Sequence, residues 1–169
     1  RVQAKKIGEF FRKKNIKIYK VLSSEWCRCK ETANLAFDNF ITKNFLNSFY
    51  NLRFAKNKNQ QMKDLRKYVK KIKSKKNLIF VTHYVVISEA LDYPSASGEI
   101  VVSDKKNRSI LLTLFLKSKK KVFNVSKYIQ KKLLNLLYDN VFLDNDSQID
   151  TPIKKILSNN CNALNIILY

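Results

Sequence analysis

The chain is poor in the residues that break helices, cross-link secreted domains or bind metals. Its 169 residues include two Gly, two Pro, three Cys and one His. The cysteines, Cys27, Cys29 and Cys161, form no even disulfide framework. A Cys-x-Cys pair beside a single histidine is also a poor ligand set for zinc. We therefore expect buried or free thiols and no metal site.

Long apolar runs are absent as well. No stretch of about eighteen or more uncharged apolar residues occurs, so the sequence predicts no membrane span. No signal peptide is visible, and Arg1 already stands inside a segment that reads as helix. We expect that the amino-terminal part is missing. A cytoplasmic location is favoured, with export left open for that reason.

Negative charge is scarce, since 34 Lys and Arg face 13 Asp and Glu, for a net charge of +21. Such a balance attracts nucleic acids, anionic lipids or phosphorylated substrates. The lysines are scattered along the whole chain among many Asn, Ile, Phe and Tyr, as an AT-rich genome would produce. Clustering on one face, rather than total charge, indicates a nucleic-acid surface. We expect no specific nucleic-acid binding, and a basic module for nucleic acids or anionic surfaces remains the alternative.

What the sequence does contain is an alternation of helical and strand-like segments. Helical periods cover residues 1–15, 26–37, 60–73, 84–91 and 122–137. Strand-like runs cover residues 16–22, 77–82, 99–104 and 110–116. The continuous apolar run at 77–82 is typical of a parallel strand that is covered on both faces. The alternation predicts an α/β fold with a mainly parallel sheet and helices on both faces.

Polar side chains follow two of these strands directly. Ser23 and Ser24 end the first strand, and His83 follows the second. Ligands of doubly wound sheets bind beyond the carboxyl ends of the strands. We therefore expect both segments to meet at one crevice.

Several short motifs carry a resemblance to a known family. The stretch VLSSEWCRCKETANLAF resembles a strand-turn-helix signature in which a Ser-Ser turn is followed by arginine, then by Glu or Gln, Thr and Ala. The matching positions are Ser24, Arg28, Glu31, Thr32 and Ala33.

A second signature and three weaker motifs occur in the order in which the family has them. VTHYVVI resembles a buried strand that ends in Val-Thr and a histidine, here His83. RVQAKKIG resembles the helix before the first signature through Gln3, Ala4 and Gly8, and SGEIVV and LNSFY resemble two further segments. On these motifs, residues 1–103 resemble small bacterial phosphoglycerate-mutase-like histidine phosphatases. Residues 104–169 resemble nothing, which favours read-through after a frameshift over a native extension.

The resemblance implies a phosphatase that hydrolyses phosphomonoesters through a phosphohistidine intermediate, without a cofactor. Arg28 and His83 match two walls of the phosphate cage and are the candidate catalytic residues, Ser24 is a further phosphate-binding candidate, and Glu99 is a candidate proton donor. A charged, hydrogen-bonding cage suits a transferred phosphoryl group. The substrate would be a phosphorylated small molecule or protein; the oligomeric state stays open.

Each of these residues also has an ordinary structural interpretation. Arg28 fits a surface arginine on an amphipathic helix, and His83 fits a core histidine with a backbone partner. Ser23 and Ser24 fit helix N-caps, and Glu99 fits a carboxylate at the start of a strand.

The main departure from the family is the nucleophile. The resemblance places it in an Arg-His-Gly motif on a central first strand, but no such motif occurs and His83 is the sole histidine. Removing a covalent nucleophile leaves only residual catalysis. We expect a partial domain at 1–103 that lacks its first strand and is close to inactive. A pseudoenzyme that binds phosphate without chemistry is the alternative.

Overall fold

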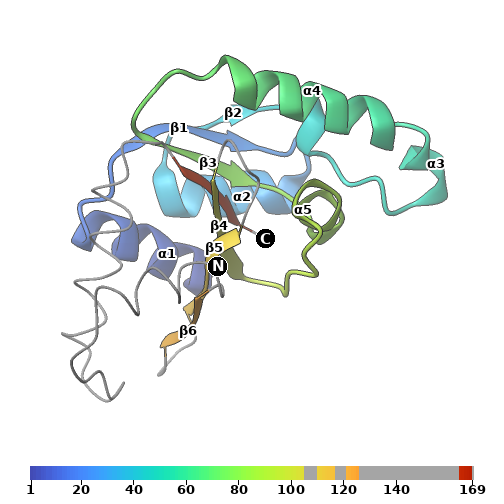
Figure 1. Ribbon diagram of the computed structural model, residues 1–169. Helices are drawn as coiled ribbons and strands as arrows, with labels where there is room; N and C mark the ends of the chain where they lie inside the picture. The colour runs from blue at the N-terminus through green and yellow to red at the C-terminus, as the bar shows by residue number, and fades with distance from the viewer. Residues whose placement is uncertain (105–109, 117–120, 126–163, 169) are drawn as a thin grey trace.

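A mixed seven-stranded sheet organises the described residues. The computed structural model describes residues 1–104, 110–116, 121–125 and 164–168 (Figure 1). The strands lie in the order β2-β1-β3-β7-β4-β5-β6. They are β1 (Ile18–Ser23), β2 (Ile41–Thr42), β3 (Asn77–Val81), β4 (Glu99–Asp104), β5 (Ile110–Leu116), β6 (Lys121–Val125) and β7 (Leu164–Leu168). An α/β architecture is thereby confirmed.

The half of the sheet that holds β2, β1, β3 and β7 is parallel. β1 pairs with β3 so that Leu22 lies opposite Phe80 and Ser23 opposite Val81. All residues of β3 are buried, as its continuous apolar run predicts for a strand with cover on both faces. β1 and β3 consequently end at the same edge of the sheet.

The other half is antiparallel, which corrects two expectations and adds one strand that was not expected. β4 pairs antiparallel with both β7 and β5, and β5 with β6. A mainly parallel sheet is therefore wrong for this half. The helix expected at 122–137 is wrong at its start, where β6 ends at Val125; its remainder lies outside the described residues. β7 was not expected, because its five residues lie in or beside a stretch with only weak patterning.

Two helices cover one face of the sheet. They are α1 (Val2–Lys13) and α2 (Cys27–Phe37), and their apolar residues pack with Val21, Ile79 and Val81 of the strands. Gly8 permits the close approach of the two helices, because a Cβ at this position would collide with the carbonyl oxygen of Ala36.

The opposite face is covered by a second group of helices. These are the 3₁₀ turn η1 (Asn44–Leu46), the short α3 (Leu52–Ala55), α4 (Lys58–Lys71) and α5 (Tyr84–Leu91). Met62 and Leu65 of α4 and Ile87 of α5 share a buried cluster with Leu22 and Phe80. Helices therefore lie on both faces, as expected. None of the helices in the described part of the chain is long and apolar enough to cross a membrane.

Candidate functional site

The carboxyl ends of β1 and β3 bring the two sequence signatures together. The amide of Ser24 donates to the carbonyl of Val81 over 2.9 Å, which extends the ladder by one residue beyond β1. His83 follows two residues after Val81 and is the N-cap residue of α5. Because the strands are parallel and in register, Ser24 and His83 become neighbours although they are 59 positions apart.

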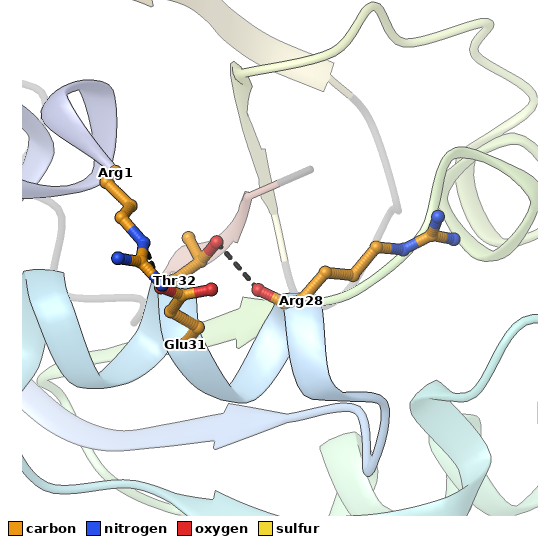
Figure 2. A network of polar contacts seen from close by, with 4 residues as sticks. All are labelled: Arg1, Arg28, Glu31 and Thr32. Carbon is orange, nitrogen blue, oxygen red and sulfur yellow. Dashed lines mark hydrogen bonds and ion pairs between the residues drawn. The ribbon is translucent and has the colours of Figure 1, made fainter.

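Arg28 reaches the same point from the first turn of α2. One terminal nitrogen, Nη2, lies 2.7 Å from Nδ1 of His83. Figure 2 shows the Arg28 side chain extending away from Arg1, Glu31 and Thr32, while its carbonyl accepts a hydrogen bond from Thr32 Oγ1. The structure thus brings Ser24, Arg28 and His83 together. Their roles as catalytic or phosphate-binding residues stay predictions.

Trp26 flanks this group as an aromatic wall. The Arg28 guanidinium carbon lies 5.3 Å from the centroid of its ring, within the range of a cation–π contact. The His83 ring meets the same indole edge to face, with centroids 5.0 Å apart. Trp26 therefore limits the positions that both side chains can take.

The partners of His83 determine its tautomer. An arginine can only donate, so Nδ1 of His83 must be the acceptor of the 2.7 Å bond and carries no proton. The proton of the neutral ring then sits on Nε2 and is donated to Ser24 Oγ over 3.0 Å. Ser24 in turn donates to Oδ1 of Asn47 over 2.9 Å. The hydrogen bonds run in one direction, from Arg28 through His83 and Ser24 to Asn47.

Asn47 is a member of this network that sequence reasoning missed. Its Oδ1 also accepts from the Glu25 amide at 2.8 Å, and its Nδ2 donates to Glu25 Oε2 at 2.6 Å. It follows η1, more than twenty positions from the Ser-Ser turn. The LNSFY motif contains this residue, but no local spacing indicates that its side chain faces Ser24.

Burial and the neighbouring charge keep the His83 ring neutral. Desolvation is the larger cause and the Arg28 cation the smaller one, and together they lower the pKa of His83 to about 4. The side chain is 1% exposed. At neutral pH the ring is therefore an uncharged donor to Ser24, and it does not act as a base toward that hydroxyl.

Cys29 is the one thiol in contact with this group among the described residues. Its Sγ lies 3.6 Å from His83 Nε2 and donates to the Thr82 carbonyl at 3.6 Å. Burial raises the pKa of the Cys29 thiol, an effect that Arg28 partly offsets. The thiol is protonated at neutral pH and packs as a small apolar group.

Ser23 and Ser24 do not act as N-caps of α2. The N-cap residue is Trp26, so the capping interpretation was wrong in its position. Ser24 Oγ accepts from the Trp26 amide at 3.2 Å and so supports the turn before the helix. The Ser23 hydroxyl donates to the Ser24 carbonyl over 2.9 Å.

Glu99 has a structural role at the start of β4. Its two carboxylate oxygens accept from the Tyr93 hydroxyl at 2.7 Å and the Ala96 amide at 2.8 Å, which closes the loop between α5 and β4. Its hydrogen bonds in the described structure include none to Arg28 or His83. The proton-donor role of Glu99 stays a prediction without a contact to support it.

A small cavity of about 270 Å³ lies beside Arg28 and Cys29. Gln3 of α1 lines it and donates to the Gly98 carbonyl at 3.2 Å. Gly98 has φ of 77°, a conformation that glycine adopts without strain. The motifs around Gln3 and Gly98 therefore meet in space next to Arg28.

Two further findings bear on the identity of the site. One concerns metal ligands and the other concerns related proteins. Within the described ranges, no group of three or more His, Cys, Asp and Glu is arranged to hold a metal ion. No protein-family model matches the sequence, and no curated protein matches it either.

Proposed function

We propose that this chain is part of a phosphoglycerate-mutase-like histidine phosphatase, and that Arg28 and His83 form two walls of its phosphate site. One observation carries the proposal. Two motifs that resemble the same family meet at the carboxyl ends of adjacent parallel strands, where an exposed arginine touches a buried histidine. This edge is where α/β sheets bind ligands.

The charge at this point suits a phosphate group. Arg28 stays cationic at any working pH, and its planar fork can give two hydrogen bonds to one phosphate. Its guanidinium has donors beyond the one that His83 accepts. A bound dianion would also favour the protonated imidazole, which turns Nδ1 from an acceptor into a second donor.

The nucleophile of the proposed reaction has to come from outside these 169 residues. His83 is the sole histidine, and both of its ring nitrogens are engaged, with Arg28 and with Ser24. We infer that the missing first strand would lie between β3 and β4, where β7 lies in this chain. A strand parallel to β3 at that place would end beside His83.

Phosphate binding by the chain itself is the first test. Inorganic phosphate titrated into the protein should perturb the NMR signals of His83 and of the Arg28 side chain. Arg28→Ala and His83→Ala should each weaken binding by about tenfold or more. Arg66→Ala removes an equal charge from the exposed side of α4 and is the matched control. Equal weakening in all three variants would reduce the site to general attraction by a basic surface.

Turnover of para-nitrophenyl phosphate is the second test. The chain as it stands should be close to inactive, whereas a version restored with a strand that ends in Arg-His-Gly should hydrolyse the ester. In the restored protein, Arg28→Ala should cost on the order of 3 kcal/mol, or about a hundredfold in rate. Equal turnover by both chains would place the nucleophile within these residues. Phosphate binding with no activity in the restored protein would identify a pseudoenzyme.

A further inference from the structure

Exposed apolar side chains are concentrated in two places along the chain. Seven large hydrophobic residues are exposed in the part of the chain that the structure describes, and four of them lie in the segment 50–54 and at the start of α5. These four are Tyr50, Leu52, Phe54 and Tyr84. Single exposed apolar residues are ordinary, whereas a group of them that borders a candidate site indicates a surface for a ligand.

Phe54 is joined to the phosphate site through Trp26. The rings of Trp26 and Phe54 meet edge to face, with centroids 6.0 Å apart. The same indole contacts the Arg28 guanidinium and the His83 ring. Phe54 is 41% exposed, so part of its ring surface is open to solvent. Arg28 and Phe54 are therefore both neighbours of one indole ring.

A second aromatic pair begins directly after His83. Tyr84 is the first residue of α5, and the centroid of its ring lies 5.8 Å from that of Tyr50. The two tyrosines are 37% and 74% exposed, respectively. Rings of the segment 50–54 therefore contact a ring at the start of each of the two helices, α2 and α5, whose amino-terminal residues form the phosphate site.

Polar contacts hold the segment that carries these rings. Asn51 caps α3, because its side chain accepts from the Arg53 amide at 3.0 Å. Upstream, the Gln61 side chain of α4 donates to the carbonyls of Asn44 and Asn47 at 2.6 and 3.2 Å. None of the residues of α3 is buried, so core packing does not explain its apolar side chains.

An apolar partner without an anion fits this surface poorly. Arg28 is exposed beside Trp26, and covering a cation without a counter-charge is costly. Arg53 is a second exposed cation, directly before Phe54 in the chain. The surface therefore joins cations to aromatic rings, and its complement is a ligand that joins an anion to a ring.

We propose that the phosphate site prefers aryl phosphate monoesters, whose phosphoryl group binds Arg28 while the ring packs on the surface that Trp26 and Phe54 form. This inference rests on the proposed function, because it assigns the ester group of the same substrate. One ester oxygen separates phosphorus from the ring of such a compound, so the ring lies close to the bound anion. Aromatic pairs gain energy beyond their buried area. Because Trp26 and Phe54 touch each other, the ligand ring lies on them and not between them.

The sole tryptophan makes the test direct, since the fluorescence of Trp26 reports on the site without a label. The full chain is titrated at about pH 8 with phenyl, cyclohexyl, glycerol and inorganic phosphate, which are mainly dianions there. Phenyl phosphate should bind about tenfold more tightly than the other three. A short phosphotyrosyl peptide separates the two sources of an aryl phosphate. Tighter binding than phenyl phosphate assigns the site to protein side chains, and equal or weaker binding assigns it to small molecules.

Variants separate the ring surface from the cation. Phe54→Leu keeps an apolar side chain and should remove most of the preference for phenyl over cyclohexyl phosphate, while inorganic phosphate binds as before. Tyr19→Leu is the matched control, because Tyr19 is an exposed tyrosine near the amino end of β1, and it should change neither affinity. Arg28→Ala should weaken all four ligands by a similar factor.

The outcomes keep this proposal apart from the proposed function. If Arg28→Ala weakens phosphate binding but phenyl phosphate binds no more tightly than glycerol phosphate, the aryl preference is overturned and the phosphate site stands. If Arg28→Ala leaves every ligand unchanged, or none of them binds, the phosphate site itself is overturned and the aryl preference with it. Equal binding of phenyl and cyclohexyl phosphate, or a preference that Phe54→Leu leaves intact, would exclude the ring surface.

Discussion

Nη2 of Arg28 lies 2.7 Å from Nδ1 of His83, so a cation that can only donate determines which imidazole nitrogen carries the proton. The other nitrogen then donates to Ser24, and the hydroxyl of Ser24 turns toward Asn47. The guanidinium of Arg28 thus sets the proton position on His83, and the bonds run from Arg28 through His83 and Ser24 to Asn47. The burial of His83 and its contact with Arg28 lead to the first three predictions.

The sole histidine should titrate far below its ordinary range. In a one-dimensional proton NMR titration, His83 should show a midpoint at about 4, because burial and Arg28 disfavour its charged form. Arg28→Gln should raise the midpoint while leaving it below about 6.5, since burial is the larger cause. A midpoint near 6.5 in the unaltered protein would contradict the buried, paired ring.

The same shift predicts how stability depends on pH. The unfolded chain takes up a proton on His83 below about pH 6.5, whereas the folded chain does so only near pH 4. This contribution is therefore fully present above about pH 6.5 and is lost as the pH falls toward 4. Urea unfolding at a series of pH values should show about 3 kcal/mol less acid destabilisation for His83→Gln than for the unaltered chain. Parallel curves would refute the linkage.

Binding of a dianion should reverse the His83 shift. Sulfate, which remains a dianion in this range, should raise the pKa of His83 by about one unit, because it favours the imidazolium beside Arg28. By reciprocity, sulfate should then bind about fivefold more tightly at pH 4 than at pH 7. Arg28→Ala should abolish the shift, and Arg66→Ala should preserve it. A His83 pKa that ignores sulfate would place the anion elsewhere.

The close approach of α1 and α2 predicts that Gly8→Ala destabilises the fold. Alanine is the better helix former by about 1 kcal/mol, yet its methyl group would collide with the Ala36 carbonyl. Overpacking of this kind costs roughly 1–3 kcal/mol, so the free energy of unfolding should fall. Glu9→Ala, on the exposed side of the same helix, is the control for urea unfolding. A more stable Gly8→Ala protein would show that the helices separate freely.

The central position of β7 predicts strong sensitivity to proline. Ile166 lies between Ile79 of β3 and Val102 of β4, so its amide is part of a two-sided ladder. Ile166→Pro should lower the free energy of unfolding by about 2 kcal/mol or more. Lys121→Pro, at the first residue of the edge strand β6, should cost much less. Equal effects would argue that β7 contributes little to the sheet.

The sequence alone determined the elements whose patterns are local. The buried run of β3, the amphipathic α4 and the Ser-Ser turn before α2 were all predicted, with ends that differ by one or two residues. Ser24 and His83 could be placed at one edge because parallel strands in one sheet end together. The elements depend on residues that are neighbours along the chain, and the shared edge adds only the general rule for parallel strands.

Only the tertiary structure decided the features that depend on distant partners. A short apolar run such as Leu164–Leu168 does not reveal which strands it will pair with, and β6 pairs with β5 where helical spacing had predicted a helix. Asn47 belongs to the site because its side chain, directly after η1, accepts hydrogen bonds from Ser24 and from the Glu25 amide. The tautomer of His83 likewise follows from Arg28 and Ser24 meeting across 55 and 59 positions. Pairing and packing between distant segments depend on the whole fold, and a local period carries no information about them.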